Sequence, residues 1–597
     1  MASEGAVVVV GGGNAGVEAA VAASRHAGRV VLLTLCRSRI GELSCNPSIG
    51  GVAKGTLVRE IAALGGVMPH SADGAGIQFR MLNVSKGPAV WGPRKQQDER
   101  MYRRLQGKAL ESAGVEVVEA EALSLAGPTE SLVGVRTNRG IIEADAVVLA
   151  VGTFLEGRLF RGRERWSGGR IGDASSDSLG EDLRRRMFHV KRFKTGTPPR
   201  LVASTVDTER MTPQHEDGPV YRFAPDRGRG PGARGRCWIT ATSGRTCEAA
   251  RGGLGDSPLV SGRIEGRGPR YCPSFEDKVR RFPDRKRHRV YVEPMGIQSR
   301  LVYPSGISTS LSRETQMKML ATIPGLQRAE VARFGYAVEY GWMGRGEFDN
   351  CLGARGSRNL FFAGQICGTS GYEEAAALGL LAGANAGRLA AGLDPVAPRR
   401  SESYLGVMVD DLVRKGTTEP YRLFSSRSRN RMHLRQDNAP DRMAPLCRSL
   451  FGAVPEWIRN WRTAAAEVDG ILAGGSVDGV ELKRLAKRPE TTYGDVVGAC
   501  EELAAFPEEI AWSRILDCKY EGYIRRAEAR GRRMESLEGF SLNGVKDYMV
   551  IELISIEARQ ALNRERPATL GEAARMPSVR HSDIEGLMIH ICGDGST

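Results

Sequence analysis

Three glycines near the start of the chain have the spacing of a dinucleotide-binding turn. Residues 6–10 form an apolar run, Gly11, Gly13 and Gly16 follow in the pattern G-x-G-x-x-G, and an alanine-rich segment comes next. In such a turn the first glycine permits the tight bend, the second lets a pyrophosphate approach the backbone, and the third lets the helix pack against the strand. The pattern predicts a nucleotide site at a helix N-terminus, and the alternative is a tight strand–helix turn without a ligand.

A cysteine lies in a second loop whose composition is suited to chemistry. Cys45 belongs to residues 44–55, which contain one proline, three glycines and Lys54 and lead into a segment with helical spacing. A thiol near a cation or a helix N-terminus can have a lowered pKa and act as a nucleophile. The alternative is a small packing residue, and the spacing alone favours packing.

The strands that would position these loops are distributed along the first 400 residues. We predict strands within residues 29–34, 144–153 and 359–365, the last two ending in glycine, and a Gly/Ala-rich helix from residue 372. The second strand of a dinucleotide fold usually ends in Asp or Glu, whereas Thr34 stands here. Three glycine sites at strand ends favour FAD over NAD as the tightly held nucleotide, and the order predicts a discontinuous cofactor domain.

Composition limits the classes of function. The chain has 597 residues, and 85 Lys and Arg against 70 Asp and Glu give a net charge of +15, which is compatible with a polyanionic partner. The eleven cysteines include no C-x-x-C pair, as expected of reduced thiols in the cytoplasm. No apolar run of about 18 residues predicts a membrane span, and the first strand begins too early to leave room for a signal peptide.

Two basic segments contain aromatic residues at intervals. The cluster at residues 280–289 follows Tyr271 and Phe275 and contains Phe282, and residues 414–435 contain Tyr421 and Phe424. Such segments can bind phosphates and stack bases, and the alternative for any single arginine is a solvated face. Near the C-terminus, one predicted helical face is formed by Ile551, Ile554, Ala558, Ala561 and Leu562, and Thr569 with Glu572 matches a capping box.

These patterns predict an α/β fold with a discontinuous Rossmann-like FAD-binding domain, an inserted α/β domain and a C-terminal all-helical domain. The expected boundaries are 1–200 and 291–400 for the FAD-binding domain, 201–290 for the insertion, 401–540 for a helical region with the basic segment 414–435, and 541–597 for a helical partner-docking module.

Several longer motifs are distributed along nearly the whole chain. They are the glycine turn and residues 44–51, 194–200, 268–278, 303–310, 371–376 and 566–571. Together they resemble the MnmG/GidA family of FAD-dependent tRNA uridine 5-carboxymethylaminomethyl modification enzymes. The resemblance implies a cytoplasmic homodimer that works with an MnmE-type GTPase as a heterotetramer. It also implies FAD, NADH and 5,10-methylenetetrahydrofolate as the means of adding an aminomethyl-type group to C5 of the wobble uridine of tRNA.

The resemblance also implies roles for individual residues. The family's two catalytic cysteines fall on Cys45 and Cys272. Its FAD contacts fall on Gly11, Gly12, Gly13, Asn14, Ala15, Gly16, Ser176 and Gln365. Contacts with the nicotinamide nucleotide are expected along residues 268–282, among them Gly268, Pro269, Arg270 and Tyr271. The helical region 401–540 would bind tRNA, and the C-terminal helices of residues 541–597 would dock the GTPase.

The sequence departs from the family pattern at four places. They are Asn14, where histidine is usual but a helix cap is still possible, Trp91, Met295 and residues 426–431. Two other functions stay open. One is a folate- and FAD-dependent tRNA uridine methyltransferase of the TrmFO type, which the long helical tail disfavours. The other is a flavin-containing scaffold that binds tRNA or a GTPase without turnover, which the two cysteine loops disfavour.

Overall fold

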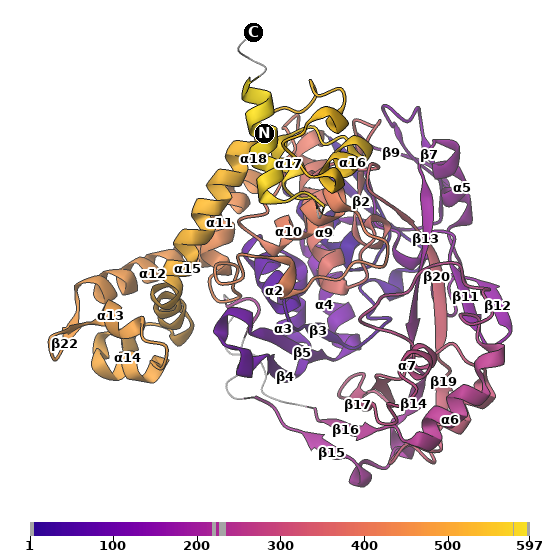
Figure 1. Ribbon diagram of the computed structural model, residues 1–597. Coiled ribbons are helices and arrows are strands. Elements are labelled where there is room, and N and C mark those ends of the chain that lie inside the picture. Colours follow the sequence, from indigo (N-terminus) through magenta and orange to yellow (C-terminus); the bar gives the residue numbers. More distant parts are fainter. Residues whose placement is uncertain (1–4, 218–221, 226–234, 577, 594–597) are drawn as a thin grey trace. The chain divides into compact units, whose positions relative to one another are not determined.

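The computed structural model describes residues 5–217, 222–225, 235–576 and 578–593, and its elements are labelled in Figure 1. The chain forms two compact units. The larger comprises Met1–Ala473 and Glu501–Ser513, and the smaller comprises Gly474–Cys500 and Arg514–Thr597. Within the described ranges, every helix is too short or too polar to cross a bilayer.

A five-stranded parallel sheet carries the predicted nucleotide turn. Its order is β21 (Leu360–Phe362), β10 (Ala146–Leu149), β1 (Ala6–Val10), β2 (Arg29–Thr34) and β6 (Glu116–Glu119). The strands are apolar runs because both faces of a parallel sheet are covered. The last strand in the chain, β21, pairs with β10 after an interval of about 200 residues, so the predicted discontinuous α/β domain is confirmed.

Two helices cover this sheet and pack closely against each other. α1 (Asn14–Ala23) and α9 (Tyr372–Ala390) meet along alanines of α1 and a row of glycines of α9 spaced four residues apart. A Cβ added at Gly379 or Gly383 would lie 2.1 Å from the carbonyl oxygen of Ala15 or Ala19. Small residues therefore let the two backbones touch, and this packing fixes the N-termini of both helices at the carboxyl end of the sheet.

The inserted part is built around a six-stranded antiparallel sheet (Figure 1). Its order is β15 (Thr212–Gln214), β16 (Cys237–Ala241), β17 (Arg289–Pro294), β18 (Leu301–Ser305), β14 (Arg200–Val202) and β19 (Val331–Arg333). Its core includes residues of α6 (Gly244–Gly252), α7 (Phe275–Arg281) and α8 (Arg313–Leu320). The sheet thus extends from residue 200 to residue 333, beyond the predicted limits of 201–290.

Two smaller sheets join these parts. One contains β12 (Glu164–Ser167), β11 (Arg158–Arg161), β20 (Tyr336–Met343) and β13 (Val190–Thr197). The other contains β3 (Ser48–Gly50), β5 (Gly92–Gln97) and β4 (Gly76–Leu82), and α2 (Lys54–Ala63) follows β3 directly. Residues 44–55 therefore form a loop, a short strand and a helix start, and α4 (Glu99–Ser112) follows β5.

Helices dominate after residue 400, as predicted. The larger unit contains α10 (Tyr404–Asp410), α11 (Ala439–Phe451) and most of α12 (Glu456–Gly474). The smaller unit contains a two-stranded hairpin, β22 (Ser476–Val477) and β23 (Val480–Glu481), so the tail is not entirely helical. Its last helices are α16 (Ile556–Glu565), α17 (Leu570–Ala573) and α18 (His581–Gly593).

The residues of the predicted helical face near the C-terminus are buried as expected, but two of them do not lie on a helix. Ile551 and Ile554 precede α16 in an irregular segment, yet both are buried in the module's own core together with Ala558 and Leu562. Thr569 caps α17 as predicted, and the carboxylate of Glu572 accepts from the backbone N–H of Ala568, the residue before the cap.

Candidate active site

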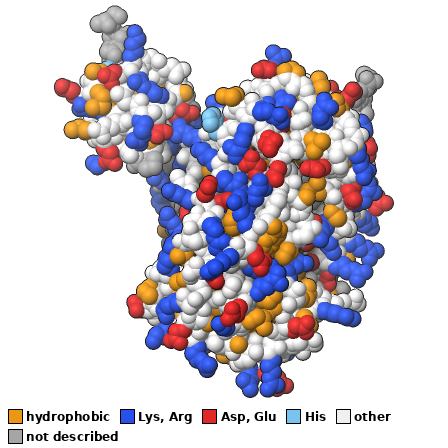
Figure 2. Space-filling model, turned by 90° about the vertical axis from the view of Figure 1, so that its right-hand side faces the viewer, with side chains coloured by type: hydrophobic (Ala, Val, Ile, Leu, Met, Phe, Trp, Pro, Cys, Tyr) orange, Lys and Arg blue, Asp and Glu red, His pale blue; other side chains and the backbone are white. Residues whose placement is uncertain are grey.

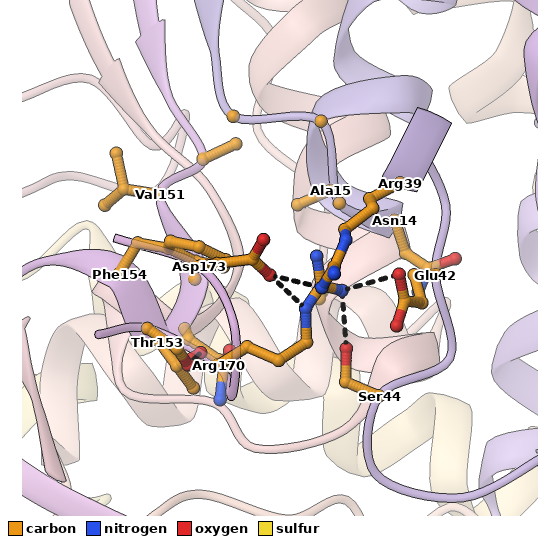
Figure 3. Close-up of a pocket in the computed structure, with 18 of the residues that line it drawn as sticks. Asn14, Ala15, Arg39, Glu42, Ser44, Val151, Thr153, Phe154, Arg170 and Asp173 are labelled. Atoms are coloured by element: carbon orange, nitrogen blue, oxygen red, sulfur yellow. Dashed lines mark hydrogen bonds and ion pairs between the residues drawn. The ribbon is translucent and has the colours of Figure 1, made fainter. Parts of the chain in front are cut away.

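A cavity opens at the carboxyl end of the parallel sheet (Figure 3). It is lined by the turn after β1, by residues that follow β2 and β10, and by the start of α9. Residues predicted to contact FAD line it as well: Gly11, Gly12, Gly13, Asn14, Ala15, Ser176 and Gln365. This is the place where α/β folds of this kind bind nucleotides.

The three glycines of the turn meet three different requirements. Gly11 has a φ of +115°, and a Cβ there would lie 2.3 Å from the carbonyl oxygen of Ala150. A Cβ at Gly16 would lie 1.7 Å from the carbonyl oxygen of Gly11, so Gly16 serves packing and lies outside the cavity lining. Gly13 has an ordinary φ of −78°, and no described atom lies within 4 Å of an added Cβ. Gly13 therefore faces open space in the cavity.

Asn14 does not cap α1, contrary to the sequence-based expectation. Gly13 occupies the cap position without a side-chain hydrogen bond, and Asn14 is the first helical residue. The Oδ1 atom of buried Asn14 accepts a hydrogen bond of 2.9 Å from the hydroxyl of Tyr102 on α4. The N–H groups of the first turn of α1 are thus left without a side-chain cap, as an anion-binding helix terminus requires.

Several charged side chains that were not predicted from the sequence line the cavity and pair with one another (Figure 3). Arg170 contacts Asp173 at 2.6 Å, Glu42 at 3.3 Å and the hydroxyl of Ser44 at 2.9 Å, and Arg39 contacts Asp173 at 2.8 Å. Glu42 and Asp173 are the carboxylates that line the cavity in place of an acidic residue at Thr34. Glycines at 168, 169 and 172 beside Arg170 were the available signal in the sequence.

Cys45 lies in the wall of the same cavity. The lowered pKa that the loop composition allowed is not found, because burial raises the pKa of the thiol and Cys272 raises it further. Arg422, Arg200 and Lys54 oppose this shift but do not overcome it. The Nζ atom of Lys54 forms ion pairs with two carboxylates, with Glu373 at 2.9 Å and with Glu374 at 3.1 Å.

Cys272 approaches Cys45 from the inserted part of the chain. It closes a turn in which its N–H donates to the carbonyl of Pro269 at 3.3 Å, and the thiol is half-buried. Cys272 raises the pKa of the Cys45 thiol and, like Cys45, that of Arg422, so the two thiols lie near the same guanidinium, although Cys272 is outside the described lining of the cavity. Both are free thiols.

Residues 268–271, predicted to contact the nicotinamide nucleotide, lie outside the lining of this cavity. A Cβ at Gly268 would lie 2.5 Å from the Lys194 side chain, which places this segment against β13. Arg270 pairs with Glu419 at 3.5 Å, and the exposed Tyr271 ring lies 4.3 Å from the ring of Phe424. The segment therefore runs between β13 and residues 419–424.

The basic segment 414–435 is only partly exposed: Lys415, Arg429 and Arg431 are exposed whereas Arg435 is buried, so a nucleic-acid surface there stays a prediction. Arg435 is fully buried and pairs with Asp437 at 2.7 Å, and Lys415 pairs with Asp411 at 2.9 Å. Tyr421 is buried beneath Arg427, whose guanidinium carbon lies 4.0 Å from the ring centroid. The sequence cannot show this pairing because the acidic partners flank the segment rather than lie within it.

A second cavity, in the inserted part of the chain, is lined by an exposed cluster of basic residues. It has a volume of about 1220 Å³ and lies between β16, β17 and α7. Its cationic lining residues are Arg210, Lys278, Arg285, Lys286, Arg287 and Arg289, with no Asp or Glu among the described residues that line it. The Nε2 atom of buried His288 has no hydrogen-bond partner. Figure 2 shows one face of the molecule, on which many Lys and Arg side chains are interspersed with Asp and Glu.

Comparisons with known proteins agree with this geometry. The family model described as Glucose inhibited division protein A matches residues 6–394, and the model described as tRNA modifying enzyme MnmG/GidA C-terminal helical bundle matches residues 531–595. The tRNA uridine 5-carboxymethylaminomethyl modification enzyme MnmG of Syntrophotalea carbinolica is 42% identical over 608 residues, with 98% of each chain covered.

Two solved structures of Aquifex aeolicus GidA are each 38% identical to this chain. The form I crystal has a TM-score of 0.87 and covers 98% of this chain and 100% of that chain. The form II crystal has a TM-score of 0.85 and covers 99% of this chain and 98% of that chain.

Proposed function

Because this chain belongs to the MnmG/GidA family, we propose that it binds FAD in the cavity beside Gly13 and modifies C5 of the wobble uridine of tRNA. It is a tRNA uridine modification enzyme, and the aminomethyl-type product is the finer proposal. The observation that carries the proposal is the common location of the nucleotide turn and Cys45, with Cys272 as a close neighbour. The match at residues 531–595 supports this function over the shorter methyltransferase type.

The residues of the cavity fit a bound flavin nucleotide. The first turn of α1 offers uncapped N–H groups, and Gly13 leaves space for a pyrophosphate. Glu42 and Asp173 are placed to accept hydrogen bonds from ribose hydroxyls, with Arg170 and Arg39 holding them in position. FAD would supply the redox chemistry on the one-carbon unit that 5,10-methylenetetrahydrofolate carries.

The two thiols supply the covalent part of the reaction. Carbon C5 of uracil is a poor nucleophile until a thiolate adds to C6, which forms an S–C6 bond and moves the C5=C6 electron pair into an enolate. After C5 has bonded to the one-carbon unit, loss of the C5 proton and breakage of the S–C6 bond restore the ring. An amine, ammonium or glycine, then replaces the folate nitrogen on the transferred carbon, and tetrahydrofolate leaves with the electron pair of the broken C–N bond. One cysteine would add to the base, and the other would serve proton transfer or a second nucleophilic step.

NADH and tRNA are proposed to bind on the inserted part. The exposed Tyr271 ring and Arg270 offer stacking and charge for the nicotinamide nucleotide along residues 268–271. The basic cavity fits the phosphates of tRNA, because exposed cations line it without carboxylates among the described lining residues. Of the aromatics predicted to stack there, Phe282 is exposed whereas Phe275 is fully buried and serves the core.

We expect tRNA affinity to fall steeply with salt. Each neutralised phosphate releases about 0.7–0.9 counterion, so several contacts give a log–log slope of several units. Replacing Arg285 and Arg287 together by Ala should reduce that slope by roughly one to two units. The measurement is tRNA binding by fluorescence anisotropy between ~50 and ~200 mM salt.

Lys318→Ala provides the matched control for this experiment. Lys318 lies on α8 outside the basic cavity and pairs with Glu314 at 2.6 Å, so its loss should leave the slope unchanged. Affinity that stays flat over the salt range, or an unchanged slope in the double variant, would contradict the proposed site.

The C-terminal module is proposed to dock the MnmE-type GTPase, while the chain acts as a cytoplasmic homodimer. The apolar residues that the sequence offered for docking are buried inside the module. Others are exposed: Val550 is 69% exposed and Ile556 is 66% exposed. Exposed apolar side chains on a module with its own core are suited to a protein interface.

The double change Val550→Asp and Ile556→Glu should abolish co-elution with the GTPase and leave flavin content unchanged. Ile556 is the first residue of α16, where a carboxylate is favourable to the helix, so the module should stay folded. Removal of residues from 540 onward should have the same effect, measured by size-exclusion chromatography with flavin absorbance. Met317→Glu, at an exposed position of α8, is the control. Unchanged co-elution would place the partner elsewhere.

A further inference from the structure

The first three residues of α9 hold two loops that reach the active site. The hydroxyl oxygen of Tyr372 accepts hydrogen bonds from the N–H groups of Cys45 and, at 3.1 Å, of Asn46. Glu373 accepts from the N–H of Gly50 at 2.7 Å and also pairs with Lys54. Glu374 accepts from the N–H of residue 423 at 3.0 Å, beside Arg422. One helix start therefore fixes the cysteine loop at both ends.

We propose that Tyr372 is a positioning residue that sets the direction of the Cys45 thiol, a role that rests on the proposed function of Cys45. Two successive N–H groups converge on a single phenol oxygen, and such a pair of donors ordinarily forms a site for an anion. The N–H and the Sγ of Cys45 branch from the same Cα, so a fixed N–H restricts where the thiol can lie. Tyr372 and Cys45 both line the cofactor cavity.

The phenol is suited to this role because it stays neutral. Burial raises the pKa of Tyr372 well above its usual range, and the neighbouring Cys45 raises it further. A tyrosinate would repel a thiolate on Cys45, whereas the neutral hydroxyl accepts from both backbone donors and keeps its own proton for a third partner. Tyr372 thus can hold the loop without opposing ionisation of the thiol.

We expect removal of the Tyr372 hydroxyl to change the position of the Cys45 thiol and to leave the rest of the loop in place. Glu373 holds Gly50 independently, so removal of the Tyr372 hydroxyl leaves the far end of the loop and the start of α2 in place. The close packing of α9 on α1 does not involve the hydroxyl either. Tyr372→Phe should therefore release only the segment at Cys45 and Asn46.

The test combines flavin content, turnover and thiol chemistry in Tyr372→Phe. We expect unchanged flavin absorbance, a loss of kcat of about tenfold or more with KM little changed, and an altered rate of Cys45 alkylation by iodoacetamide as a function of pH, followed by peptide mass spectrometry. Tyr336→Phe is the control for alkylation, because its hydroxyl accepts from the N–H of Ile171 at 3.4 Å in the same cavity and does not touch the cysteine loop.

The outcomes separate this inference from the proposed function. Wild-type kcat and wild-type alkylation of Cys45 in Tyr372→Phe would overturn the positioning role. Altered alkylation together with full turnover by Cys45→Ser would leave the positioning role standing and remove Cys45 from catalysis. If the variant loses flavin, alkylation is compared in flavin-free protein of both kinds, and equal rates there overturn the inference.

Discussion

Replacing either Cys45 or Cys272 by Ser should abolish tRNA modification while the protein stays folded and keeps its flavin. Both thiols are half-buried and free, and serine has nearly the same size, so little packing is lost. Removal of a nucleophile or an acid–base group lowers a rate by about 10² or more. The measurement is single-turnover modification of tRNA by the purified variants, with flavin absorbance recorded in parallel.

Cys500→Ser is the matched control for these variants. Cys500 is also a half-buried free thiol, but it belongs to the smaller unit and lines none of the cavities described above. It should turn over at the wild-type rate. A cysteine variant at position 45 or 272 with near-wild-type turnover would remove that thiol from the mechanism.

Gly13→Val should cause the protein to lose its flavin without unfolding. Valine adopts the ordinary φ of −78° at this position, and no described atom lies within 4 Å of the added Cβ. The side chain would instead fill the space that a pyrophosphate needs. A clash that costs only about 1.4 kcal/mol weakens binding tenfold. Flavin absorbance per mole of protein and the thermal unfolding midpoint are the two measurements.

Two other glycines separate a cofactor effect from a folding effect. Gly470→Val on α12 also enters open space but lies outside the cofactor cavity, so it should keep full flavin content. Gly16→Val must clash with the carbonyl of Gly11, so it should lower the unfolding midpoint as well. If Gly13→Val retains full flavin absorbance, the nucleotide lies elsewhere.

The parallel sheet and its nucleotide turn could be predicted from the sequence because they depend on local patterns. The apolar runs that end at Val10, Leu149 and Phe362 became adjacent strands, and the glycine spacing predicted the turn between β1 and α1. Cys45 could be singled out as a thiol in a shaped loop, although its burial and the resulting rise in its pKa could not be seen.

What the sequence could not show are charges paired over long distances. Arg170 and Glu42 are far apart in the chain, and only the fold brings them together as an ion pair in the lining of the cavity. Burial is also hidden in the sequence: Arg435 was expected on a surface, whereas it is fully buried and pairs with Asp437, two residues along the chain. The inserted sheet extends beyond the predicted boundary at residue 290, because β18 and β19 follow that residue and pair with β14.

The nucleotide cavity and the two thiols are proposed to modify the wobble uridine of tRNA at C5. The most direct measurement is nucleoside analysis by mass spectrometry of tRNA from cells that lack this gene and carry the wild-type, Cys45→Ser or Cys272→Ser protein. We predict that an aminomethyl-type C5 substituent appears only with the wild-type protein. The same substituent with both cysteine variants, or only 5-methyluridine with the wild-type protein, would contradict the account.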